Sequence, residues 1–145
     1  MITYELLNTA VELGKVAAIM AQHDAELYPE DGNPDLQAFT SMVNAGMTRI
    51  YVVKKDMRIV GYALFVLSRD FFRAHIVQAE CISIYIKPES RGLYFKRLMQ
   101  FAERELKHEH VNRLLVGANT SVKSLEKLYA RFGFKPINVM MSKEI

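Results

Sequence analysis

Three strand-like runs follow one another without an intervening helix, and this pattern constrains the fold more than any other feature of the sequence. The runs cover residues 49–55, 59–69 and 75–87 and are separated by short polar or turn-forming stretches. Only residues 56–58 lie between the first two runs, which is short enough for a hairpin. The third run follows a loop at residues 70–74. The sequence therefore predicts an antiparallel meander.

Helical and shorter strand-like segments flank this meander. A strand is expected over residues 2–8, with helices over 10–26 and 35–45 on either side of a turn-rich break. The helical period returns after Pro88 and ends near residues 108–110. The remaining expected elements are a strand over 113–119, a helix over 121–132 and a last strand in the tail 136–145. This order predicts an α/β (α+β) fold, with a mixed and mostly antiparallel central sheet of about six to seven strands flanked by about four helices.

Composition narrows the class of protein further. A chain of 145 residues, half of them hydrophobic and 24% charged, is expected to form one globular domain over residues 1–145. The net charge of +3 is dispersed along the chain, so composition gives no reason to expect a nucleic-acid partner. The single cysteine, Cys81, is expected to be a small buried side chain in a reducing compartment. Without a signal-like start or an apolar run of membrane length, the prediction is a cytoplasmic protein with no membrane partner.

The segment IKPESRGLYFKRLM, residues 86–99, joins a strand-like run to an amphipathic helix through a basic turn. The N-terminus of a helix that follows such a turn can bind an anion through its backbone N–H groups and its dipole. Arg91, Lys96 and Arg97 add positive charge. A plain strand-to-helix connection accounts for the same residues equally well, so both interpretations stand.

Two side chains could take part in proton transfer. If strand alternation holds, Glu80 shares one face with Ile82, Ile84 and Ile86. Its carboxylate is then either at a solvated end of the strand or partly buried with a raised pKa suited to accepting a proton. Tyr129 lies on the predicted helix that stops at Gly133. A tyrosine in a surface helix is more often a packing residue than a catalytic one.

Several segments, in this order along nearly the whole chain, resemble the GCN5-related N-acetyltransferase (GNAT) superfamily. They are VVKKDMRIVGYALF, IYIKPESRG, RLMQFAEREL and VGANTSVKSLEKLYARFGFKP, followed by a closing Met-x-Lys strand. The most specific marker is Tyr-Ala-Arg-Phe-Gly-Phe with an asparagine ten residues before the tyrosine. The resemblance implies an N-acetyltransferase that uses acetyl-CoA as co-substrate, needs no metal, and transfers the acetyl group to a primary amine.

The resemblance also implies roles for individual residues. Tyr129 is the expected general acid for the departing CoA thiolate, and Glu80 is the expected base, acting directly or through water. The backbone of residues 84–86 is expected to pair with the pantetheine arm, the turn amides of residues 91–96 to take the pyrophosphate, and Asn119 to hold the pantetheine from the next strand. The expected cofactor-binding residues are Ile84, Tyr85, Ile86, Arg91, Gly92, Leu93, Tyr94, Phe95, Lys96, Asn119 and Ser124.

The turn departs from the family pattern, in which Arg or Gln is followed by two residues, Gly, one residue and then Gly or Ala. Both later small residues are missing, and Tyr94 and Phe95 either block the phosphate pocket or turn into the core while Lys96 supplies a charge contact. If they block it, the chain is a catalytically degenerate GNAT-fold binding or assembly protein that does not turn over acetyl-CoA.

The expected partner is a small-molecule or protein amine. The connector between the first two helices carries five acidic residues: Asp24, Glu26, Glu30, Asp31 and Asp35. They would attract a cationic amine, although a solvated connector is the simpler explanation. A homodimer is a further expectation, because dimers are common among similar proteins. A nucleic-acid partner would depend on five basic residues around the hairpin: Lys54, Lys55, Arg58, Arg69 and Arg73. Basic residues in such a position usually form a solvated surface. The four histidines lack a spacing that indicates a metal site.

Overall fold

The computed structural model describes residues 1–7, 10–119, 122 and 124–145. Contacts divide the chain into two compact units, Met1–Leu115 and Val116–Ile145. The first unit holds the long strands and the longer helices, and the second holds one short helix and the tail. The single domain that the sequence predicts over residues 1–145 stays a prediction.

The strands of the sheet lie side by side in chain order, which confirms the predicted meander. They are β1 (Ile2–Leu7), β2 (Thr48–Lys55), β3 (Arg58–Arg69), β4 (Val77–Ile86) and β5 (Arg113–Val116). Each pair from β1 to β4 is antiparallel, and Asp56 and Met57 form the tight β2–β3 turn with positive φ angles of 49° and 66°. The long β3 is therefore paired on both sides, which satisfies its backbone hydrogen bonds.

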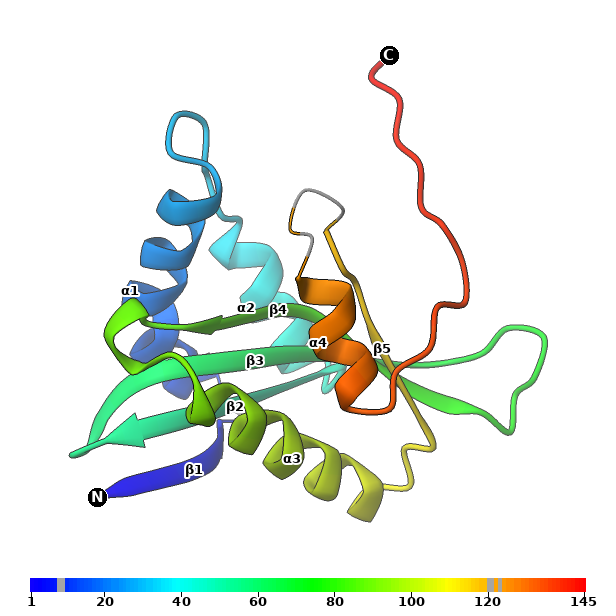
Figure 1. Ribbon diagram of the computed structural model, residues 1–145, viewed down its shortest axis with the longest axis horizontal. Helices are drawn as coiled ribbons and strands as arrows, with labels where there is room; N and C mark the ends of the chain where they lie inside the picture. The colour runs from blue at the N-terminus through cyan, green and yellow to red at the C-terminus, as the bar shows by residue number, and fades with distance from the viewer. Residues whose placement is uncertain (8–9, 120–121, 123) are drawn as a thin grey trace. The chain divides into compact units, whose positions relative to one another are not determined.

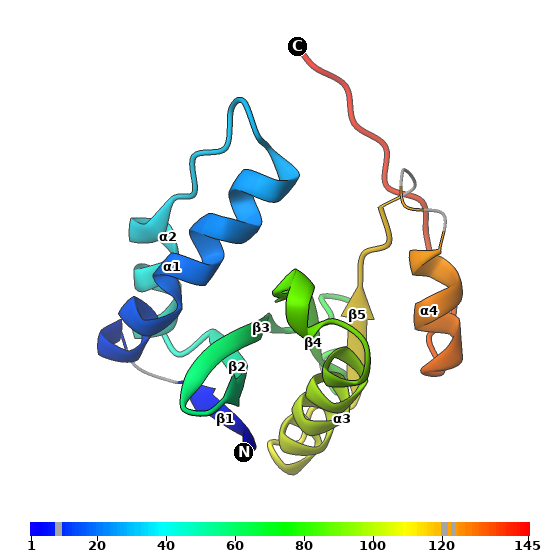
Figure 2. The same ribbon diagram turned by 60° about the vertical axis from the view of Figure 1, so that its left-hand side comes forward.

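Helices cover both faces of this sheet. Figures 1 and 2 show α1 (Ala10–Leu27) and α2 (Leu36–Asn44) along one face and α3 (Leu93–His108) along the other. The core on the α1 side is Leu7, Leu13, Val16, Ile19, Met20, Val43, Ile50, Val52, Tyr62, Leu64 and Tyr85. On the α3 side, Phe101 packs edge-on against Tyr51 of β2, and Leu98 and Leu106 are fully buried. These two apolar layers hold β3 and β4 in place.

A β-bulge in β4 changes which side chains face each helical layer. Leu64 of β3 pairs with Ser83, but the next residue, Phe65, pairs with Cys81, so Ile82 has no partner in the ladder. One extra residue shifts the alternation of side chains by one position. The expectation that Glu80, Ile82, Ile84 and Ile86 share a face is therefore wrong: Ile84 and Ile86 face α3, while Glu80 shares the α1 face with Ser83 and Tyr85.

The C-terminal part of the chain also differs from expectation. The sheet of the described residues has five strands rather than six or seven, because the tail from Phe134 to Ile145 forms no strand. Two of its apolar side chains, Val139 and Met141, are 85% and 88% exposed. An apolar pattern in the sequence is therefore not enough to pair the tail with another strand. β5 ends at Val116 rather than at residue 119, and α4 spans Leu125–Arg131. The predicted helix start at Ser121 lies outside the described residues.

Cys81 is buried beside the bulge, as the sequence predicts. Burial raises the pKa of its thiol to about 12, because an apolar site disfavours the thiolate. This cysteine is therefore a packing residue of the sheet.

We expect Leu98→Ala to destabilise the fold by about 2–5 kcal/mol, because the variant leaves a cavity between α3 and the sheet. Leu98 is 0% exposed, whereas Leu93 on the same helix is 54% exposed. The matched control Leu93→Ala should therefore change stability by no more than about 0.5 kcal/mol. Urea unfolding followed by circular dichroism measures both values, and equal losses would contradict this assignment of the α3 core face.

Candidate active site

The turn between β4 and α3 has the backbone geometry of an anion site. A short 3-10 helix, η1 (Pro88–Ser90), leads to Arg91 and then to Gly92, which has φ of 109°. Glycine adopts this region without steric cost. α3 starts at the next residue, and its N-cap residue Gly92 makes no side-chain capping bond. A Cβ built on Gly92 would meet no atom within 4 Å, so the space beside the turn is open.

The bulky residues of the turn point partly into the protein. Tyr94 and Phe95 are partly buried, whereas Lys96 is exposed. Burial raises the pKa of Tyr4 on β1, Arg97 opposes this effect, and Tyr94 adds a smaller contribution that raises it. The backbone N–H of Phe95 donates to the carbonyl oxygen of Gly92 at 3.2 Å. The partial burial of Tyr94 and Phe95 favours the alternative in which these side chains turn into the core, and the charge contact expected from Lys96 stays a prediction.

Arg91 is engaged with the protein itself. Its Nε donates to the carbonyl oxygen of Ile86 at 3.0 Å, and its guanidinium forms a 2.6 Å ion pair with Glu26 near the end of α1. The same guanidinium lies over the Tyr85 ring, 5.6 Å from its centroid. The side chain that was expected to add charge for a phosphate therefore ties the turn to α1. One of the expected pantetheine contacts, the Ile86 carbonyl, is already an acceptor.

A polar cluster on the α1 face was not singled out from the sequence. His23 of α1 stacks on Tyr85 with ring centroids 4.6 Å apart, and its Nδ1 lies 2.7 Å from the Tyr62 hydroxyl. The Tyr62 hydroxyl is also 2.8 Å from the Ser83 hydroxyl. Tyr85 donates its hydroxyl proton to Glu26 at 2.7 Å, which joins this cluster to Arg91. Ser83 and Tyr85 share this face by simple alternation with Ile84 and Ile86, but their partners come from β3 and α1, so no local sequence period indicates the cluster.

Glu80, the expected base, lies on the same face but is exposed. Glu80 pairs with Val66 of β3. It precedes Ser83 by three residues, and the bulge lies between the two. Its position corresponds to the solvated alternative that the sequence left open.

The second unit holds the remaining predicted residues. Tyr129 is 5% exposed on α4, and its ring packs edge-on against Phe134 at 5.6 Å. Gly133 ends the helix with φ of 90°, as expected for a glycine stop. Asn119 and Ser124 are exposed, and Ser124 stands at the N-cap of α4 without a side-chain capping bond. These residues belong to one compact unit, whereas Glu80 and the turn belong to the other.

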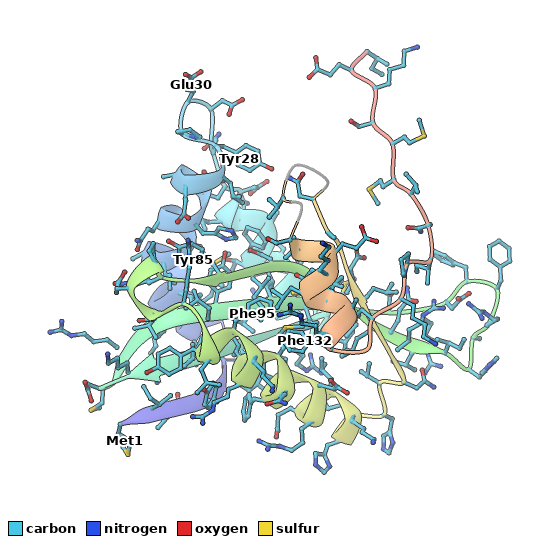
Figure 3. All side chains as sticks on the ribbon, in the orientation of Figure 1. Met1, Tyr28, Glu30, Tyr85, Phe95 and Phe132 are labelled. Atoms are coloured by element: carbon cyan, nitrogen blue, oxygen red, sulfur yellow. The ribbon has the colours of Figure 1, made fainter. Side chains whose placement is uncertain are left out.

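The acidic connector divides into engaged and exposed carboxylates. Asp35 caps α2 by accepting the N–H of Ala38 at 2.9 Å, and Glu26 is engaged with Arg91. Figure 3 shows Glu30 at the tip of the connector between α1 and α2. Glu30 and Asp31 are both exposed. The connector therefore presents fewer available carboxylates than its sequence implies.

Within the described ranges, no three or more His, Cys, Asp or Glu side chains gather in a way that could hold a metal ion. No helix in the same ranges combines the length and apolar content needed to cross a bilayer.

Comparison with known proteins identifies the family of the chain. The sequence profile of the Acetyltransferase (GNAT) family matches residues 13–134. No curated protein sequence shows significant similarity to the chain.

Solved structures share the fold at low sequence identity. A ribosomal-protein-alanine N-acetyltransferase from Brucella melitensis biovar Abortus 2308 has a TM-score of 0.77 at 16% identity, with 100% of this chain and 99% of that chain covered. An aminoglycoside acetyltransferase from an uncultured soil metagenomic sample, in complex with sisomicin, has a TM-score of 0.80 at 15% identity, with 99% and 96% covered. A predicted acetyltransferase from Clostridium acetobutylicum, with acetyl-CoA, has a TM-score of 0.78 at 13% identity, with 99% and 96% covered.

The Glu26–Arg91 pair predicts a pH-dependent contribution to stability. The Arg91 hydrogen bond, followed by that of Tyr85, lowers the pKa of Glu26 from its ordinary value of 4.5. A carboxyl with a lowered pKa stabilises the folded state above its ordinary pKa, and this contribution disappears as pH falls through the folded-state value. We therefore expect Glu26→Gln to lower the melting temperature at about pH 7, and the difference from the wild type to shrink towards about pH 3.

The matched control for this experiment is Glu30→Gln, because Glu30 is an exposed glutamate of the same connector. Differential scanning calorimetry across the pH range measures all three proteins. A difference between wild type and Glu26→Gln that stays constant with pH would contradict the role of the ion pair.

Proposed function

Because the chain belongs to the GNAT acetyltransferase family, we propose that it transfers an acetyl group from acetyl-CoA to a primary amine in a ternary complex. The observation that carries this proposal is the turn before α3, where Gly92 with its positive φ stands at the helix N-terminus and makes no side-chain capping bond. A solved structure of similar fold, from Clostridium acetobutylicum, contains acetyl-CoA. Both observations support use of the same co-substrate.

The proposed acetyl-CoA site is built mainly from backbone. The N–H groups at the start of α3 would bind the pyrophosphate, with Lys96 adding charge from the exposed side of the helix. The β4 backbone of residues 84–86 would pair with the pantetheine arm. The family resemblance assigns Asn119 and Ser124 to the same co-substrate. In this proposal Arg91 keeps the turn in position rather than contacting phosphate, because its guanidinium already binds Glu26 and Ile86.

The proposed chemistry is direct attack of an uncharged amine on the thioester carbonyl carbon. A carbon–nitrogen bond forms, the carbon–sulfur bond breaks, and Tyr129 gives a proton to the departing CoA thiolate. A strand N–H of β4 would donate to the carbonyl oxygen, where negative charge develops. The family resemblance assigns the base to Glu80. An exposed carboxylate in that position would act through a water molecule.

The acceptor is proposed to be a cationic amine. Solved structures of similar fold include enzymes named for aminoglycosides and for a ribosomal-protein alanine, and both of these acceptors carry amines. The exposed Glu30 and Asp31 of the connector would attract such a cation. A homodimer belongs to the same proposal and can be tested by light scattering.

The alternative is a binding or assembly protein on the same fold, without acetyl-CoA turnover. Tyr94 and Phe95 in place of small residues, together with the engagement of Arg91 by Glu26, favour this alternative. A nucleic-acid partner has less support. Two of the five basic residues on which it depends are in ion pairs, Lys54 with Glu5 and Arg73 with Asp70.

The first test is a calorimetric titration with acetyl-CoA and with desulfo-CoA as a non-reactive control. We expect micromolar binding by the wild type. Gly92→Ala should weaken this binding by about tenfold or more, because alanine is strained at φ of 109° and would move the turn amides. The matched control is Gly14→Ala in α1, where a Cβ meets no atom within 4 Å. No heat with the wild type at millimolar ligand would favour the binding-protein alternative.

A second test concerns the general acid. Tyr129→Phe should lower kcat by roughly 10- to 1000-fold for an amine that the wild type acetylates, because the CoA thiolate would leave without its proton donor. The Phe variant keeps the ring that packs on Phe134, and an unchanged melting temperature would show that the fold is intact. An unchanged kcat would make Tyr129 a packing residue.

A further inference from the structure

The α1 face of β4 holds an imidazole that is fixed by two hydroxyl groups. His23 Nδ1 lies 2.7 Å from the Tyr62 hydroxyl and 3.3 Å from the Ser83 hydroxyl. The ring is further held by stacking on Tyr85. Three contacts from β3 and β4 therefore set both the position and the plane of a side chain that belongs to α1.

These contacts leave the other ring nitrogen available. In the described part of the chain, neither a hydrogen bond nor an ion pair involves His23 Nε2, and the residue is only partly buried. In the tautomer with a proton on Nδ1, this N–H donates to the Tyr62 oxygen, and the Tyr62 O–H can donate in turn to Ser83. Nε2 then carries the lone pair, and the chain of hydroxyls also accommodates the doubly protonated ring.

The surroundings of His23 favour its neutral form at neutral pH. Burial lowers the pKa of His23, and so does the charge of Arg91, while Glu26 and Asp24 oppose this effect. The neighbours from the sheet, Tyr62 and Tyr85, are phenols whose pKa values burial raises, so both stay uncharged. The resting ring is therefore neutral, as a proton acceptor must be.

We propose that His23 Nε2 takes the proton from the acceptor ammonium group, in place of the carboxylate that the family resemblance assigns to Glu80. This inference depends on the proposed acetyl transfer. If the pantetheine pairs with β4 at residues 84–86, the Ser83 side chain lies next to the thioester on the α1 face. His23 is then within reach of an amine that approaches from α1, whereas Glu80 lies beyond the bulge.

The protons balance in this scheme. The ammonium group gives one proton to His23, and the resulting amine forms the carbon–nitrogen bond as the carbon–sulfur bond breaks. The thiolate takes a proton from Tyr129, and the second proton lost by the nitrogen restores Tyr129. His23 then releases its proton to solvent, so that the products are the amide, CoA thiol and one proton.

The test measures CoA thiol release from acetyl-CoA by His23→Gln, Glu80→Gln and wild type, between about pH 5 and pH 9. Spermidine and a lysine-containing peptide are the amine probes, and water is the acceptor in their absence. The wild type should lose kcat at acid pH as His23 becomes protonated. His23→Gln should lower kcat by about 100-fold or more and remove this acid limb. The matched control His108→Gln changes an exposed histidine of α3 and should behave as the wild type.

Two further readouts separate a catalytic from a structural role. His23→Ala should regain activity when imidazole is added, which a loss of packing would not allow. Acetyl-CoA affinity and melting temperature should show whether each variant is folded. An acid limb that persists in His23→Gln, or that disappears only in Glu80→Gln, would overturn the proposal while leaving acetyl transfer intact. No thiol release by the wild type would overturn acetyl transfer and this inference together.

Discussion

The bulge at Ile82 is the constraint that brings Glu80 to the same face of the sheet as Ser83 and Tyr85. Ser83 and Tyr85 face α1 because they pair with Leu64 and Tyr62, and a regular β4 would place Glu80 on the opposite face, which α3 covers. With Ile82 left out of the ladder, Glu80 faces α1 together with Ser83 and Tyr85. His23 has ring and hydroxyl partners on the sheet, and Glu26 has the Tyr85 hydroxyl. The face that α1 contacts therefore holds side chains from both sides of the irregularity in β4.

Arg91 extends this arrangement from the sheet to the turn. In the family pattern that the sequence resembles, small residues let the backbone approach phosphate, and this chain has Tyr94 and Phe95 there. In the structure these residues are partly buried, and Gly92 at the N-terminus of α3 makes no side-chain capping bond. The guanidinium meanwhile bonds to the strand and to α1. The shape of the turn is therefore maintained by contacts on its protein side, and the backbone amides remain the groups suited to an anion.

Much of the fold could be predicted from sequence, because strand and helix periods, turn residues and length are local signals. The meander, the helices and the glycine stop at Gly133 follow from them. The faces of β4 could not be predicted, since a bulge is a property of the register between two strands. The tail has an apolar pattern, but a strand also needs a hydrogen-bonding neighbour, and residues 134–145 have none in the described structure. The His23 cluster joins three elements far apart in the chain, so no local motif indicates it.

The Glu26–Arg91 ion pair also couples the binding of an anion to Arg91 with the binding of a cation to Glu26. An anion that drew the guanidinium away would free a carboxylate on the α1 side, and a cation bound to that carboxylate would release the guanidinium. Linkage requires each ligand to change the affinity of the other by the same factor. An exposed surface ion pair limits this coupling to a modest size and makes it weaken with salt. Cooperativity between oppositely charged ligands would therefore decline as ionic strength rises.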